Sequence, residues 1–375
     1  MEKKIICKLV CLLTYVCGVL TTACQHHESI STNEEGDTIS LRYARNLTMV
    51  QYENRLEVFQ RNPWDTSKVL NHYTIVQEKG KYPNEVLVPL RKAAVFTSVH
   101  CALLQELGVE TSIGGVYDLQ YIHLPFITQK IKAGTILDLG NAMNPNIELV
   151  MELHPDALMP NPFENSGGYG RLEQLGIPII ECADYMEASP LARAEWLRFY
   201  GMLCGCEERA DMLFQSVDNN YHQLKALAAK AKTKPSVVVD KVTGSVWYVP
   251  GGKSTIGQMI RDANAQYAWA DDEHSGSISL PFETVLERAG DADVWLFRYS
   301  GDHDITYDEL LSEHHGYNQF KAFKNQTAYG CDVERSLFYE ESPFHPERLL
   351  SDFIHILHPE LDTMTSMRYF KEVNR

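Results

Sequence analysis

The feature of this sequence that most constrains its fold is the stretch of residues 207–232, which contains neither glycine nor proline. Its apolar side chains recur at steps of three and four residues, which is the spacing of one face of an α-helix. These side chains are Ala210, Leu213, Phe214, Val217, Tyr221, Leu224, Ala228 and Ala231. A helix over this stretch would be roughly 39 Å long at about 1.5 Å per residue. The pattern predicts one long helix that can cross from one lobe of the protein to another.

Strands and helices are predicted to alternate on both sides of this helix. Before it, strands are expected at residues 92–96, 111–114, 157–159 and 178–182, and helices at residues 98–107, 146–153, 171–175 and 189–203. After it, strands are expected at residues 236–240, 293–297 and 326–329, and helices at residues 254–263, 282–289, 307–312 and 346–357. This alternation is typical of a mostly parallel sheet with helices on its faces. The predicted fold class is α/β, with two α/β lobes joined by one long helix.

The first 24 residues predict where the protein is located. Three lysines precede an apolar run at residues 9–20, and the small residues that follow lead directly to Cys24. This is the pattern of a secretory signal peptide, and the apolar run is too short to span a bilayer. A cysteine at this point resembles a bacterial lipoprotein signal, in which it becomes the lipidated first residue of the mature chain. The alternative is a plain secretory signal with a cysteine there by chance.

The chain divides into five predicted segments. Residues 1–23 are a lipoprotein signal peptide, residues 24–39 a polar tether, and residues 40–205 an N-terminal lobe that begins with a β-rich extension. The extension carries predicted strands at residues 46–51, 55–60 and 72–77. Residues 206–232 form the connecting helix, and residues 233–375 form the C-terminal lobe.

The net charge of the chain limits which partners it can bind, and the cysteine content indicates whether it contains disulfides. The formal charge is −16, and removal of the leader takes away three lysines and one glutamate, which leaves about −18. A protein this acidic is repelled by nucleic acid and by an anionic membrane surface. We therefore expect it to contact the membrane only through the lipid on Cys24. Beyond Cys24 the cysteines are Cys101, Cys182, Cys204, Cys206 and Cys331. Their odd number and irregular spacing predict mostly buried thiols rather than a disulfide framework.

Several motifs together resemble the substrate-binding lipoproteins of ABC importers that take up iron complexes, haem or cobalamin. They lie at residues 88–95, 113–116, 138–140, 146–158, 281–286 and 292–296, and residues 146–158 (NIELVMELHPDAL) are the most specific of them. The resemblance extends from about residue 86 to residue 359. It implies two lobes joined by a rigid helix, with a ligand held in the cleft between them. It also implies that Glu148 and Glu283, one on each lobe, engage basic residues of the membrane permease.

The resemblance further implies a binding protein rather than an enzyme. It would be a monomer without a cofactor, anchored through Cys24 on the periplasmic side of the cell envelope. Its partners would be an ABC permease and a metal chelate, which could be a ferric siderophore, haem or a corrinoid. No direct metal ligands are expected.

Candidate ligand-binding residues follow from the rule that ligands of α/β folds lie at the carboxyl ends of the strands. The residues that follow predicted strands are Ser98, His100, Tyr117, Asn161 and Phe163 in the first lobe, and Trp247, Tyr248, Arg298 and Tyr339 in the second. Aromatic rings offer contact area to a large, partly apolar chelate. The guanidinium of Arg298 suits a carboxylate or the negative charge of a ferric chelate. Any one of them could instead pack on the surface of its lobe.

The sequence leaves two other functions open. The same fold could act as a stand-alone scavenger of metal chelates, or the chain could be a secreted α/β hydrolase. The hydrolase is disfavoured because no Gly-x-Ser-x-Gly pattern occurs. The run Gly251–Thr255 has the tail of a phosphate-binding loop, but Trp247 stands where the first glycine of that loop is needed.

Overall fold

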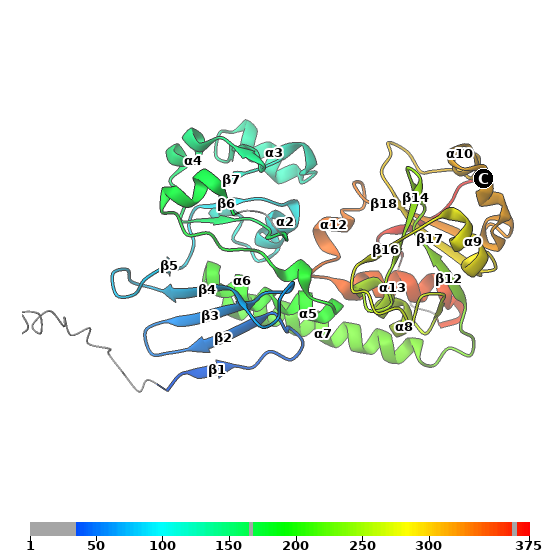
Figure 1. Ribbon diagram of the computed structural model, residues 1–375, viewed down its shortest axis with the longest axis horizontal. Coiled ribbons are helices and arrows are strands. Elements are labelled where there is room, and N and C mark those ends of the chain that lie inside the picture. Colours follow the sequence, from blue (N-terminus) through cyan, green and yellow to red (C-terminus); the bar gives the residue numbers. More distant parts are fainter. Residues whose placement is uncertain (1–34, 165–167, 362–365) are drawn as a thin grey trace, which may run out of the picture. The chain divides into compact units, whose positions relative to one another are not determined.

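The computed structural model describes residues 35–164, 168–361 and 366–375 (Figure 1). The predicted leader, Cys24 and most of the predicted tether lie outside these residues. Within the described residues, no helix is both long enough and apolar enough to cross a bilayer. The five cysteines of this part are free, and all but Cys206 are buried, which confirms the prediction of mostly buried thiols.

The sheet of the first lobe has four parallel strands in the order β11-β6-β7-β8 (Figure 1). The strands are β6 (Ala93–Val95), β7 (Ile113–Val116), β8 (Leu137–Asp138) and β11 (Ala157–Met159), and the helices are α2 (Ser98–Glu106), α3 (Pro125–Lys132) and α4 (Ile147–Leu153). A short hairpin of β9 (Gly140–Asn141) and β10 (Asn144–Pro145) precedes α4. Every residue of β6, β7 and β11 is buried, as expected for parallel strands covered on both faces.

The second lobe contains a five-stranded sheet in the order β15-β12-β17-β18-β19, in which only β19 is antiparallel to its neighbour. Its strands are β12 (Ser236–Val239), β15 (Gln266–Tyr267), β17 (Val294–Tyr299), β18 (Ala328–Asp332) and β19 (Phe370–Glu372). Its helices are α8 (Thr255–Asp262), α9 (Phe282–Ala289), α10 (Tyr307–Glu313), α11 (Lys321–Lys324), α12 (Phe338–Glu341) and α13 (Pro346–Leu357). The two lobes of mixed α/β structure confirm the predicted fold class.

A smaller antiparallel sheet of the second lobe was not predicted. It consists of β13 (Val242–Thr243), β14 (Val246–Pro250) and β16 (Ser277–Leu280). In the first lobe, the segment expected to be a strand at residues 178–182 runs parallel to β11. Leu158 donates to Pro178, and Ile180 donates to Leu158, but the pairing forms only an isolated bridge between Ile179 and Leu158 rather than a regular strand. The helix expected at residues 171–175 is a 3₁₀ helix, Gly170–Leu175.

The long helix α7 spans Glu207–Ala228, four residues fewer at its end than predicted. It follows α5 (Pro190–Glu195) and α6 (Leu197–Cys204), and Gly205 separates α6 from α7 in the left-handed conformation, with φ at 67°. Ala210, Phe214 and Val217 are buried members of the predicted apolar stripe. Helix α13 of the second lobe packs against α7, so α7 shares its core with the lobe that follows it.

The β-rich extension is a five-stranded sheet in the order β1-β2-β3-β4-β5. Its strands are β1 (Asp37–Ile39), β2 (Leu47–Gln51), β3 (Leu56–Arg61), β4 (Val69–Val76) and β5 (Glu85–Leu87). Because β1 pairs with β2, residues 37–39 of the segment predicted to be a tether belong to this sheet. The first three predicted strands correspond to β2, β3 and β4.

Buried carboxylates attach the loop between β1 and β2 to the helices. Glu195, fully buried on α5, accepts the backbone N–H groups of Arg42, Tyr43 and Ala44 at 2.7–2.9 Å. Asp218 of α7 accepts the guanidinium of Arg42 at 2.6 Å and the hydroxyl of Tyr43 at 2.7 Å. Hydrogen bonds to charged groups are the stronger ones, so this part of the extension is fixed to the helices of the body.

Candidate functional site

The first lobe has a cavity of about 480 Å³ at the carboxyl ends of β6 and β11. Its lining side chains include Phe96, Met143, Asn161, Phe163 and Tyr169. The two sequence-predicted residues among them, Asn161 and Phe163, therefore lie together as expected. Phe163 is 45% exposed and Met143 is 77% exposed, so both present apolar surface that a ligand can cover. We call this cavity the first-lobe pocket.

Asn161 brings an unused acceptor to the first-lobe pocket. Its Oδ1 atom is buried and has no hydrogen-bond partner in the described part of the chain. A buried acceptor without a donor costs free energy, which a ligand N–H or O–H group can recover. The first-lobe pocket thus combines exposed apolar side chains with a polar group that can orient a ligand.

Two other predicted residues of this lobe are buried beneath the surface. His100 is 1% exposed, and its Nε2 lies 2.9 Å from Asp184 Oδ1 and 3.0 Å from the hydroxyl of Tyr200. Tyr117 has no exposed surface and packs on Phe96 with a ring-centroid distance of 4.0 Å. The expectation that these side chains face a ligand is therefore corrected: His100 belongs to a buried charge network, and Tyr117 supports the wall of the pocket.

Ser98 occupies the first turn of α2 but does not cap the helix. The preceding residue, Thr97, is the N-cap, and its Oγ1 accepts the backbone N–H of His100. Ser98 is half-buried next to the first-lobe pocket, which Thr97 lines. Its position at the end of β6 agrees with the sequence expectation, although its hydroxyl plays no part in the cap.

In the second lobe, Trp247 and Tyr248 lie within β14 rather than in a loop after β12. Trp247 is fully buried, donates its indole N–H to the Val239 carbonyl at 2.9 Å, and packs on Trp295 at 6.1 Å between centroids. Tyr248 points to the opposite face of the strand and is 46% exposed. The predicted position of Trp247 is therefore wrong, because the strand alternation turns this side chain into the core.

Arg298 lies at the end of β17, but its charge is already paired. Its Nε and Nη2 atoms donate to the two carboxylate oxygens of Asp240 at 2.9 and 2.6 Å. Burial opposes the charged form, yet the Asp240 carboxylate outweighs it and raises the pKa of Arg298. The side chain keeps 33% of its surface exposed. An anionic ligand would therefore meet a neutralised pair rather than a free cation.

The lobes contact each other where α2 packs against α12 and where Arg348 of α13 lies near Glu106 of α2. His345, which precedes α13, lies 2.6 Å from Glu106 of α2 and 2.9 Å from Glu347 of α13. Arg348 adds a contact of 3.7 Å to Glu106. A cavity of about 260 Å³ adjoins these side chains and is lined by both lobes. We call Glu106, His345, Glu347 and Arg348 the interlobe ion cluster.

The interlobe ion cluster predicts a stability that declines in alkali. Burial by itself would lower the pKa of His345, but Glu106 and Glu347 outweigh it and raise the pKa to about 9. This stabilisation is complete below about pH 6.5 and is lost as the pH rises through about 9. We expect the charge on His345 to contribute about 2–3 kcal/mol that disappears between pH 7 and 10. Urea unfolding at pH 7 and pH 10 of the unchanged protein and of His345→Gln measures this contribution. If the free energy of unfolding changes with pH by the same amount in both proteins, the prediction is contradicted.

Sequence reasoning did not single out three exposed residues of the first lobe. Two of them, Tyr121, which is 69% exposed, and His123, lie in the segment after β7, which ends at Val116, two residues later than predicted. His123 Nε2 lies 3.9 Å from Glu334 Oε2 of the second lobe. Met143 was also missed, since the β9-β10 turn that presents it has no strong local signal. Tyr339 of α12 was expected and is 48% exposed.

The two predicted docking carboxylates have similar surroundings. Glu148 lies in the first turn of α4, which Asn146 caps by accepting the N–H of Leu149, and Glu283 lies in the first turn of α9. Both side chains are exposed, and neither has an ion-pair partner among the described residues. A carboxylate at this position is favoured by the helix dipole and remains free to contact another protein.

The sequence and the structure were compared with known proteins. Residues 94–334, well over half of the chain, match the sequence model of a family that is described as periplasmic binding protein. An uncharacterized lipoprotein of Methanocaldococcus jannaschii is 26% identical over an alignment that covers 92% of this chain and 88% of that protein.

Solved structures show the same fold at low sequence identity. A periplasmic haem-binding protein from Pseudomonas aeruginosa has a TM-score of 0.58 at 17% identity, covering 76% of this chain and 98% of its own. A protein from Saccharomonospora viridis, described as an ABC-type Fe³⁺-hydroxamate transport system, has a TM-score of 0.54 at 19% identity, covering 74% and 94%. Almost the full length of each is therefore matched by about three quarters of this chain.

Proposed function

This chain belongs to the periplasmic binding protein family, and from that premise we propose that it delivers an iron complex or a corrinoid to the permease of an ABC importer. The matched residues 94–334 include most of both sheets, so the family relation rests on both lobes. The relatives that bind haem or transport a ferric hydroxamate favour an iron complex. The first-lobe pocket is the observation that carries the proposal, because it lies where α/β folds hold their ligands.

We propose that side chains from both lobes that are at least partly exposed contact the chelate. Ser98, Asn161 and Phe163 come from the first lobe, and Tyr248, Arg298 and Tyr339 come from the second. The aromatic rings would cover the apolar face of the chelate, and Asn161 would accept one hydrogen bond from it. His100, Tyr117 and Trp247 are left out of this set, because their own side chains are buried.

The anchor and the docking residues complete the proposal. The lipid on Cys24 would hold a monomer on the periplasmic side of the membrane and raise its effective concentration at the permease. Glu148 and Glu283, one on each lobe, would orient the protein on basic residues of the permease. A protein that serves this role binds its ligand without converting it.

A titration tests the ligand class. The purified protein is titrated with a panel of ferric siderophores, haemin and cyanocobalamin, and intrinsic tryptophan fluorescence is followed. We expect saturable quenching by one iron complex, with a dissociation constant raised about tenfold in Phe163→Ala, since buried aromatic contacts carry much of a binding energy. Met212→Ala removes an exposed side chain of α7 far along the sequence and serves as the control, with no change expected. Absence of saturable binding by every member of the panel would contradict the proposal.

A further inference from the structure

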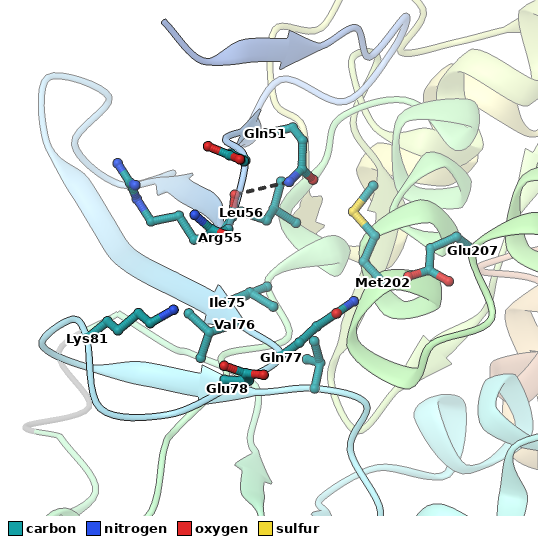
Figure 2. A pocket seen from close by; sticks show the side chains of 13 residues that line it. Gln51, Arg55, Leu56, Ile75, Val76, Gln77, Glu78, Lys81, Met202 and Glu207 are labelled. Carbon is teal, nitrogen blue, oxygen red and sulfur yellow. Dashed lines mark hydrogen bonds between the residues drawn. The ribbon is translucent and has the colours of Figure 1, made fainter. Parts of the chain in front are cut away.

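A second cavity, of about 380 Å³, belongs to the β-rich extension (Figure 2). Gln51 and Arg55 lie on one side of it, and Gln77, Glu78 and Lys81 lie on the other. Met202 and Glu207 reach it from the helices. It shares no lining residue with the first-lobe pocket or with the cavity between the lobes. We call it the extension pocket.

The floor of the extension pocket is apolar, although most of the lining around it is polar. Leu56, Ile75 and Val76 of the sheet are each less than 7% exposed, and the side chains of Val88 and Met202 are half-buried. A volume near 380 Å³ lies within the range of about 300–1,000 Å³ found for small-molecule sites. The shape and the floor of the extension pocket therefore suit a small apolar group.

The rim of the extension pocket is negatively charged. Glu53, Glu78 and Glu207 are exposed, and in the described part of the chain no ion pair occupies any of them. The guanidinium of Arg55 is already used, since its Nε donates to Glu57 at 2.7 Å. Its guanidinium also lies 4.1 Å from the ring centroid of Tyr52. Among the described residues of the rim, three carboxylates thus carry no ion pair, and the two cations are Arg55, which is already used, and Lys81.

We propose that the extension pocket binds a small organic cation, such as a primary ammonium group on an apolar stem. The stem would cover the floor at Leu56, Val76 and Met202, and the ammonium group would donate to Glu78 or Glu207 on the rim. The formal charge of −16 favours the approach of a cation over that of an anion.

This site is distinct from the proposed transport function. The family match begins at residue 94, whereas all lining residues of the extension pocket except Met202 and Glu207 precede it. Because Glu207 is the first residue of α7, an occupant would contact the start of the helix that joins the lobes. The extension pocket can therefore bind its cation while the cleft is empty or filled.

The test uses hexylammonium as the probe. The full chain is labelled with ¹³C at its methionine methyl groups, and the Met202 resonance is assigned from the spectrum of Met202→Leu. We expect hexylammonium to shift this resonance saturably. The dissociation constant should be about millimolar, because a probe with so few atoms can gain only a small binding free energy. Hexanol, which has no charge, and hexanoate, which has the opposite charge, should shift it much less. Equal shifts from all three, or none from hexylammonium, would overturn the proposal.

Variants locate the charge that selects the cation. The double variant Glu78→Gln, Glu207→Gln should raise the dissociation constant for hexylammonium about fivefold, the scale of two exposed charge contacts. The control Glu208→Gln, Glu287→Gln removes the same charge from exposed positions outside the extension pocket and should change it little. If both double variants bind the probe as the unchanged protein does, the carboxylates do not form the site and the proposal fails.

Discussion

A protein in which Glu148 and Glu283 are both replaced by alanine is expected to keep its affinity for the chelate and to lose about tenfold or more of chelate uptake. The two carboxylates are exposed in the first turns of α4 and α9, and neither is among the residues that line the first-lobe pocket. Charges at the rim of an interface orient the encounter and exclude wrong arrangements. With one carboxylate on each lobe, a single replacement leaves one orienting contact, so each single variant should lose less than the pair.

Matched controls lie on the same two helices. Glu152 follows Glu148 by one turn of α4, and Glu287 follows Glu283 by one turn of α9, and both are exposed. The variant Glu152→Ala, Glu287→Ala removes the same net charge and should leave uptake nearly unchanged. Uptake is measured in cells that depend on this protein, and chelate affinity is measured on the purified variants. Equal uptake by the two double variants would contradict the docking role of Glu148 and Glu283.

Elements with strong local boundaries could be predicted from the sequence. Helices α9 and α13 and strand β11 have the bounds that their residues predict. Proline stands at the first position of α13, and proline also precedes the first residue of α9, where its fixed φ favours a helix start. Helix α7 was found for a different reason, namely its long apolar stripe, and it ends at Ala228, the last buried residue of that stripe.

Elements that depend on distant pairing could not be predicted. Strand β14 pairs with β16 through Trp247 and Leu280, which are 33 positions apart, and no local pattern reveals such a partner. Trp247 was therefore assigned to a loop and to the ligand site. His100 shows the same limit, because its burial depends on Asp184 and Tyr200, which follow much later in the chain. Strand ends locate a site in the sequence, but packing decides which side chains reach its surface.

The network around His100 predicts the largest loss of stability. Asp184 is fully buried, and it accepts the hydroxyl of Tyr200 at 2.7 Å and the guanidinium of Arg193 at 3.0 Å, besides its contact with His100. Burial disfavours the charged form of both Asp184 and His100. At Asp184, this effect of burial is outweighed by His100 and Arg193, which lower the pKa of the carboxyl group. At His100, the effect of burial is outweighed by Cys182 and Asp184, which raise the pKa of the ring. Replacing Asp184 by asparagine removes one partner of a buried pair, which costs about 3–5 kcal/mol.

The pH dependence separates this effect from a simple loss of packing. Asp184→Asn removes the carboxylate that contacts His100, so the pKa of His100 should fall relative to the unchanged protein. The stability deficit of the variant should then grow as the pH falls from 8 to 5.5, because its folded state binds the His100 proton less tightly. In the unchanged protein His100 keeps its proton throughout this range. Urea unfolding at both pH values measures the difference. Asp65→Asn, which breaks an exposed pair with Lys68, serves as a control that should change the stability little. An Asp184→Asn variant that is as stable as this control, or one whose deficit is the same at pH 8 and 5.5, would show that the charge of His100 does not depend on Asp184.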